Sequence, residues 1–286
     1  MKISEIFNTG TLPVSLEIFP PKGELGVETL RSTLDELHDL APAFISVTCS
    51  AGGSGNGGGA GGKTAQLAEL VQREYNITSV AHLTCISAKR DDIDRTVEDL
   101  RSRGIENVLA LRGDRVAGRE PGDFAHASEL IEALAGRGFC IGAACYPEGH
   151  ITCDSLEADL DHLYEKQQAG ASFFTSQLFF DNDSFYRFLD AARARGIDRP
   201  ILPGIMPILS KAQITRMIFL CGASLPSQIV RLLYRYEDSP EDLRRAGIEY
   251  AAGQLCALRD HGVDGVHIYT MNHPDIARTC IEALRA

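Results

Sequence analysis

Short apolar runs alternate along the chain with longer stretches whose apolar residues recur at helical spacing. The short runs are rich in β-branched residues and predict eight strands: VSLEIF (14–19), AFISVT (43–48), SVAHLTC (79–85), NVLAL (107–111), CIGAAC (140–145), FFTSQLFF (173–180), PILPGI (200–205) and GVHIYT (265–270). Leu30, Leu34 and Leu37 illustrate the helical periodicity between them. Near-continuous apolar strands alternating with helices are typical of a parallel sheet covered by helices, and eight strands favour closure. We therefore predict the α/β class and a (β/α)8 TIM barrel.

Signals at the helix ends agree with this order of elements. Four glycines stand where a predicted helix ends before the next strand, as a left-handed C-terminal cap requires: Gly104, Gly138, Gly170 and Gly196. The stretch 206–263 has room for about three helices, so extra helices are expected before the last strand. Because 286 residues is an ordinary length for one barrel, we expect a single domain over 1–286.

Charge and composition remove several classes of protein. The formal net charge of −11 repels a phosphate backbone and argues against nucleic acid as a partner. No apolar run reaches the roughly 20 residues of a membrane helix, and the N-terminus lacks the apolar stretch of a secretory signal, so we expect a cytoplasmic protein without a membrane partner. None of the eight cysteines forms a C-x-x-C pair, so neither a disulfide framework nor a metal site is expected.

Polar residues recur at the carboxyl ends of the first six predicted strands. They are 31 to 34 residues apart, about one β/α unit each: Glu17, Thr48, His82, Asp114, Tyr146 and Gln177. Helical repeats have similar periods, but their units contain no such apolar strand. Since barrel enzymes place their chemistry at the carboxyl ends of the strands, we expect these six side chains to line one mouth.

Glu17 is the most informative of the six residues. It stands on a strand between Leu16 and Ile18 and is followed by Phe19-Pro20-Pro21, which predicts apolar surroundings. Desolvation favours the neutral form of a carboxyl group, and a carboxylic acid that stays protonated near neutral pH is what a general acid needs. A salt bridge at the strand end is the structural alternative.

Seven short motifs extend this interpretation to a known family. LEIFPPKG, AHLTC, LRGD, YPEGH, TSQLFFD, PGIMPI and YTMN, in this order, resemble the bacterial 5,10-methylenetetrahydrofolate reductases over roughly residues 14–285. The resemblance implies a (β/α)8 barrel that binds FAD non-covalently. It also implies ping-pong hydride transfer, in which NADH or NADPH reduces the flavin and leaves before the folate substrate takes its place. Members of the family are often homo-oligomers, which sets the expectation here.

The resemblance also implies roles for individual residues. Glu17 corresponds to the catalytic acid, and Asp114 to a carboxylate near both the flavin and the pterin. Folate contacts are implied for Glu17, Asp114, Gln177, Gln213, Tyr269 and His273. FAD contacts are implied for Thr48, Ala51, His82, Arg112, Gly113, Asp114, Ala127, Tyr146, His150, Asp159 and Lys166. Asp159 and Lys166 are seven residues apart and should share one face of a helix.

Four positions depart from the family pattern. Cys49 stands where many relatives have tyrosine, Glu165 where a basic residue is common, Met217 where an aromatic residue is common, and His273 where an arginine holds the folate tail. These departures bear on the electron donor and on recognition of the tail, so an electron-donating protein partner is a further possibility.

Two alternatives remain open from the sequence. GGGAGGKT (57–64) satisfies the G-x-x-x-x-G-K-[ST] pattern of a phosphate-binding loop and would indicate a nucleotide-binding protein. Against it, eight residues separate Thr48 from the motif, whereas a phosphate-binding loop directly follows its strand. The other alternative is a non-catalytic flavin subunit of an electron-transfer complex, which would not need the acid Glu17.

Overall fold

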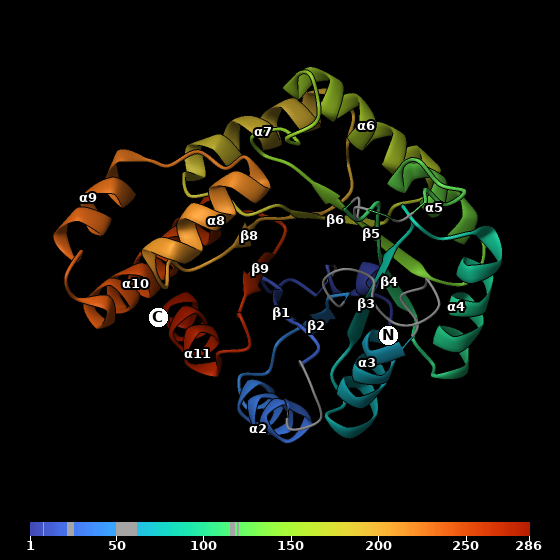
Figure 1. The fold of residues 1–286 in the computed structure, drawn as a ribbon, viewed down its shortest axis with the longest axis horizontal. Coiled ribbons are helices and arrows are strands. Elements are labelled where there is room, and N and C mark those ends of the chain that lie inside the picture. Colours follow the sequence, from blue (N-terminus) through green and yellow to red (C-terminus); the bar gives the residue numbers. More distant parts are fainter. Residues whose placement is uncertain (8, 22–25, 50–61, 115–117, 119) are drawn as a thin grey trace.

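A ring of parallel strands surrounded by helices organises the molecule (Figure 1). The computed structural model describes residues 1–7, 9–21, 26–49, 62–114, 118 and 120–286. In this part of the chain the strands lie in the order β7-β6-β5-β4-β3-β2-β1-β9-β8, and every registered pair is parallel. The strands are β1 (Val14–Ile18), β2 (Phe44–Val47), β3 (Ser79–Thr84), β4 (Asn107–Leu111), β5 (Cys140–Cys145), β6 (Phe173–Ser176), β7 (Ile201–Leu202), β8 (Gly204–Ile205) and β9 (Val266–Tyr269).

The predicted seventh strand is divided into β7 and β8. Pro203 lies between them and has no N–H to donate to a ladder. β7 pairs with β6, and β8 pairs with β9, so the short break carries the chain across the closure of the barrel. The prediction of a TIM-barrel fold is confirmed, with one strand position made of two segments.

The predicted sixth strand is too long at its carboxyl end. β6 ends at Ser176, whereas the apolar pattern extends to Phe180. Gln177 Oε1 accepts from the N–H of Leu178 at 2.9 Å, which gives this backbone group a local partner in place of a neighbouring strand. Phe179 and Phe180 are buried outside regular strand structure, so their apolar character reflects packing rather than pairing.

The helices that follow the strands form the outer layer, whereas the first helix precedes β1 and lies at one end of the barrel (Figure 1). The helices are α1 (Ile3–Ile6), α2 (Gly26–His38), α3 (Gly62–Glu74), α4 (Arg90–Ser102), α5 (Ala127–Leu134), α6 (Leu156–Ala169), α7 (Asn182–Ala194), α8 (Lys211–Cys221), α9 (Ser227–Arg235), α10 (Pro240–His261) and α11 (Pro274–Arg285). The extra helices predicted before the last strand are α8, α9 and α10. The four predicted helix-end glycines all have positive φ, between 74° and 122°. Within the described part of the chain, no helix is long and apolar enough to cross a membrane.

Alternation along each strand divides the side chains between two environments. On β1, Leu16 and Ile18 are fully buried in the large apolar cluster that also contains leucines of α2. Ser15 and Glu17, at the intervening positions, point to the other face, which is the barrel interior. The same strand therefore supplies both the packing against the helices and the polar groups of the interior.

The amino-terminal end of the barrel interior is closed by apolar side chains. Phe44, Val80, Leu109 and Phe173 come from four different strands and form one cluster with Ile3 of α1. α1 is anchored there because Asn107 Oδ1 accepts from the N–H of Ile3 at 2.9 Å. This plug leaves the opposite end as the place for polar chemistry.

We predict that Ile3→Ala lowers the free energy of unfolding by about 2–5 kcal/mol, because it leaves a cavity in a fully buried cluster. Urea unfolding measures this change. Val230→Ala, which truncates a side chain 48% exposed on α9, serves as the control and should change stability little. Equal effects of the two substitutions would contradict the role assigned to the plug.

Candidate active site

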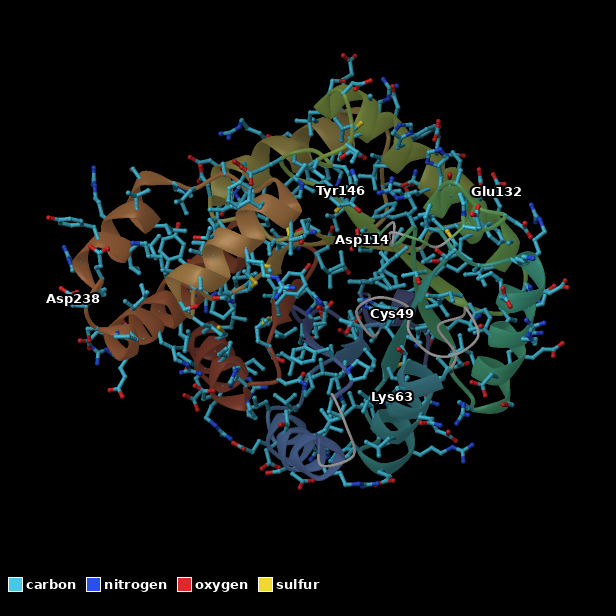
Figure 2. All side chains as sticks on the ribbon, in the orientation of Figure 1. Cys49, Lys63, Asp114, Glu132, Tyr146 and Asp238 are labelled. Carbon is cyan, nitrogen blue, oxygen red and sulfur yellow. The ribbon has the colours of Figure 1, made fainter. Side chains whose placement is uncertain are left out.

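The polar residues predicted at the strand ends do gather at one end of the barrel. Glu17 lies near the end of β1 and His82 within β3, while Asp114, Tyr146 and Gln177 follow β4, β5 and β6. Figure 2 shows Cys49, Asp114 and Tyr146 inside the ring of helices, whereas the labelled Glu132 and Asp238 lie at the periphery. His82 is deeper than the others, two residues before the end of its strand.

The Glu17 carboxylate lies between two buried imidazole rings. Its Oε2 is 3.6 Å from Nε2 of His82 and 3.5 Å from Nε2 of His267. The Glu17 side chain is 20% exposed, compared with 7% for His82 and 1% for His267. The expectation of purely apolar surroundings is therefore wrong, because Leu16 and Ile18 pack on the other face of the strand and the carboxylate itself has polar neighbours.

Ser15 fixes the orientation of the His267 ring. Its Oγ donates to the carbonyl of Val266 at 3.0 Å and is 2.8 Å from Nδ1 of His267. A hydroxyl has one proton, so a serine that donates to the carbonyl accepts from Nδ1–H. In the neutral ring Nε2 is then an unprotonated acceptor facing Glu17. This Nε2 is buried and has no hydrogen-bond partner among the described residues, so a proton on either group would join it to the carboxylate.

His82 is the second neighbour of the carboxylate. Burial lowers the pKa of His82 to about 4, although the charge of Glu17 opposes this shift and His267 adds to it. Its Nε2 is 2.7 Å from Ser46 Oγ on the adjacent strand. His82 is therefore a neutral hydrogen-bonding group at neutral pH.

Tyr269 lies beside this group on β9. Its hydroxyl donates to the carbonyl of Ser176 at 2.7 Å, and its ring meets the His267 ring edge-on with centroids 5.1 Å apart. Burial raises the pKa of Tyr269 well above its usual value. A Cβ at Gly204 would lie 2.7 Å from the ring and the hydroxyl of Tyr269, so the close approach of β8 requires glycine.

A second cluster of polar side chains lies at the carboxyl end of β5 and on α6. Lys166 Nζ donates to the carbonyl of Ala144 at 2.9 Å and lies 5.4 Å from the centroid of the Tyr146 ring. Burial lowers the pKa of Lys166, an effect that the Asp159 carboxylate opposes, while burial raises the pKa of Tyr146. Asp159 Oδ2 accepts from the N–H of His150 at 3.0 Å. Asp159 and Lys166 thus lie toward the same strand end, as their spacing predicts.

The His150 ring has a defined tautomer. Its Nδ1 accepts from the N–H of Thr152 at 3.1 Å, so the neutral ring carries its proton on Nε2. Burial, reinforced by the charge of Arg112, lowers the pKa of His150. The ring packs edge-on against Tyr146 with centroids 4.7 Å apart.

The Arg112-Gly113-Asp114 turn brings backbone close to β3. Gly113 has φ of 82°, and a Cβ there would lie 2.9 Å from Cβ of Thr84. Glycine is therefore required for both the conformation and the space. Asp114, which follows, is exposed at the mouth.

Sequence comparison identifies the family of this chain. The methylenetetrahydrofolate reductase family model matches residues 2–285. The chain belongs to this family. It is 33% identical to the 5,10-methylenetetrahydrofolate reductase of Pectobacterium carotovorum subsp. carotovorum, over 94% of this chain and 88% of that protein. It is 35% identical to methylenetetrahydrofolate reductase (NADH) 1 of Arabidopsis thaliana over 95% of this chain, but it spans only about half, 48%, of that plant protein.

A solved structure has the same fold. An uncharacterized protein from Clostridium thermocellum that binds two copies of 5-methyl-5,6,7,8-tetrahydrofolic acid superposes with a TM-score of 0.71 over the whole of both chains. The sequence identity is 14%, so this likeness concerns the fold.

Three further residues that are predicted to contact the folate in this methylenetetrahydrofolate reductase family member differ in their surroundings. Gln213 is already engaged in the first turn of α8, where its side chain accepts from Leu209 N at 2.7 Å and donates to Pro207 O at 3.3 Å. Gln177 accepts from Leu178 N. His273 is exposed at the start of α11. Their contacts with a folate remain predictions.

Two predicted flavin contacts, Thr48 and Ala127, lie in or beside the connections that follow β2 and β4. Thr48 follows β2, and its N–H donates to the carbonyl of Ile18 at 3.0 Å. Ala127 is the first residue of α5. Ala51 lies outside the described residues.

The phosphate-binding-loop alternative loses support at Thr64. Residues 57–61 of the GGGAGGKT motif lie outside the described residues. In such a loop the final hydroxyl serves the metal ion of the nucleotide. Here Thr64 is buried in α3, and its Oγ1 donates to the carbonyl of Thr48 at 3.0 Å.

Sequence reasoning missed His267, Ser46 and Ser15 as members of the site. Each is a polar residue within an apolar strand, two positions before another inward-facing polar residue. The period of two could have found them, since His267 precedes Tyr269 and Ser15 precedes Glu17 on the same face.

The lowered pKa of His82 predicts a pH dependence of stability. Between about pH 6.5 and 4 the unfolded chain binds a proton that the folded chain does not, so the free energy of unfolding falls as the pH falls through this window. His82→Asn removes this contribution and should flatten the dependence. Urea unfolding between pH 4 and 7 measures it, and the exposed His38→Asn should keep the wild-type slope. Equal slopes for all three proteins would contradict the assignment.

Proposed function

We propose that this chain reduces 5,10-methylenetetrahydrofolate to 5-methyltetrahydrofolate, with FAD as cofactor and a reduced nicotinamide as electron donor. The observation that carries the proposal is the Glu17 carboxylate, placed between the Nε2 atoms of His82 and His267 at the catalytic end of the barrel. Family membership supports the reaction class. Both bacterial and plant relatives are named as reductases of this folate.

The substrate explains why an acid is needed. Its methylene carbon bridges two nitrogens in a five-membered ring and accepts hydride poorly until protonation of a nitrogen opens the ring to an iminium. Glu17 supplies that proton in our proposal. The unprotonated Nε2 of His267 can share the proton of Glu17 beforehand, and His82, which stays neutral, adds no competing acid.

The donor groups at the strand ends fit FAD. The partly buried Lys166 ammonium and the Arg112 guanidinium suit an anionic cofactor, and the Nε2–H of His150 and the carboxylate of Asp159 add a donor and an acceptor. The backbone at Gly113 lies so close to Thr84 that it leaves no room for a side chain. We assign these residues, with Thr48, Tyr146 and Ala127, to the flavin. The cofactor supplies the hydride chemistry.

Asp114 and Gln177 are assigned to the folate pterin. The exposed Asp114 carboxylate can accept from amino groups, and the amide of Gln177 can donate and accept at once. NADH is the donor that we propose, and the plant relatives, which are named as NADH enzymes, support this choice. Delivery of electrons by a protein partner is the alternative. A homo-oligomeric state stays a prediction.

We predict that Glu17→Gln retains flavin but loses folate reduction, because the amide keeps the shape of the side chain and has no acidic proton. Reduction of the flavin by NADH should continue. Stopped-flow absorbance follows the two half-reactions separately. The matched control is Glu132→Gln, an exposed glutamate on α5 at the periphery of Figure 2.

Normal folate reduction by Glu17→Gln would contradict the acid assignment. A wild-type protein that takes up electrons from NADH but never transfers them to the folate would favour the non-catalytic flavin subunit instead.

We predict that Lys166→Met weakens flavin binding by about 10-fold or more, because it removes a partly buried cation of the proposed cofactor site and keeps most of the unbranched side chain. Flavin retained after dialysis, measured by absorbance, tests this without any turnover. Lys211→Met, on the exposed surface of α8, should retain flavin like the wild type. Full retention by Lys166→Met would remove Lys166 from the flavin site.

A further inference from the structure

The turn after β9 contains two consecutive non-glycine residues with left-handed backbone. Met271 has φ of 54° and Asn272 has φ of 59°. Asparagine tolerates this region better than most residues, whereas methionine rarely adopts it. Such backbone persists only where surrounding contacts hold it, and it is found most often at functional sites.

The side chain of Asn272 pairs with both backbone polar groups of Phe19. Oδ1 accepts from Phe19 N at 3.0 Å, and Nδ2 donates to Phe19 O at 2.9 Å. A carboxamide offers the same donor and acceptor as a peptide group. The backbone register of β9 with β1 ends at the pair Glu17–Tyr269, so the Asn272 side chain continues the ladder where the β9 backbone has turned away.

Thr270 joins this pairing to the catalytic residue. It is fully buried, and its Oγ1 donates to the backbone carbonyl of Glu17 at 2.6 Å and accepts from Asn272 N at 3.1 Å. On the opposite side, Thr48 N donates to the carbonyl of Ile18 at 3.0 Å. The end of β1 is thus held from both neighbouring strands, and β9 holds it through side chains.

We propose that Asn272 is a positioning residue that sets the Glu17 carboxylate against His267 and His82. It does so through its two hydrogen bonds to the backbone of Phe19, which hold the end of β1 and are called the bracket below. The proposal rests on the proposed function, since the position of Glu17 matters to the rate only if it delivers the proton. Glu17 is two residues before the bracket, and His267 is on the strand that carries it. A shift of about 1 Å in a reacting group can reduce a rate about 100-fold.

The test compares Asn272→Gly with Asn76→Gly. Glycine adopts positive φ without strain, so Asn272→Gly removes the bracket and leaves the turn accessible. Asn76 is the matched control because it also has positive φ, 53°, and is exposed between α3 and β3. We expect Asn272→Gly to slow the folate half-reaction about 10- to 100-fold relative to the control. Reduction by NADH should match that of the control, while the melting temperature falls modestly below it because two hydrogen bonds are lost.

Amide hydrogen exchange tests the bracket without turnover. The N–H of Phe19 should exchange faster in Asn272→Gly than in Asn76→Gly, since its acceptor is gone. If Asn272→Gly fails to fold, Asn272→Asp provides the same test. It keeps an acceptor for Phe19 N but loses the donor to Phe19 O, and it should slow the folate half-reaction as well.

Three results would overturn the proposal, and they are distinguishable. A folate half-reaction as fast as that of the control, despite faster exchange at Phe19, would show that Glu17 does not depend on the bracket. Equal slowing of both half-reactions would show a general structural role. Failure of the wild type and of Asn76→Gly to reduce the folate at all would contradict the proposed function itself, and with it any role in placing an acid.

Discussion

The contact between the Glu17 carboxylate and two buried imidazole rings is the interaction around which the carboxyl end of the barrel is arranged. Three separate strands, β1, β3 and β9, must be in register for Oε2 to lie 3.5 and 3.6 Å from the two Nε2 atoms. Withdrawing a carboxylate from water is costly unless polar partners surround it, so the serines that orient the rings belong to the same requirement. The closed parallel sheet is what brings these strands together.

The two ends of the barrel interior have opposite chemistry for a physical reason. Apolar side chains and α1 fill the amino-terminal end, which excludes water and gives the sheet a core on both faces. Among the described residues the carboxyl ends carry no comparable apolar cluster in the barrel interior, and the polar groups lie there in two sets. One set surrounds Glu17, which supplies a proton in the proposed reaction. The other surrounds Tyr146 and Lys166, where cationic and aromatic groups suit a flavin.

Much of this arrangement could be predicted from the sequence, because it depends on periodicity. A period of two along strands and a repeat of 31 to 34 residues placed Glu17, Asp114, Tyr146 and Gln177 at one end. What escaped prediction depends on contacts between distant segments. Pro203 divides the seventh strand because it sits at the closure of the barrel, and His267 joins the site because β9 returns to pair with β1. The apolar neighbours of Glu17 in sequence gave the wrong surroundings for its carboxylate, since alternate residues face opposite sides of a strand.

The decisive measurement is the visible spectrum of the purified protein, recorded anaerobically before and after NADH and then after methylenetetrahydrofolate. We expect a flavin absorbance that NADH bleaches and the folate restores, which would demonstrate both half-reactions in one sample. A protein that binds no flavin, or a reduced flavin that methylenetetrahydrofolate cannot reoxidise, would contradict the proposed function.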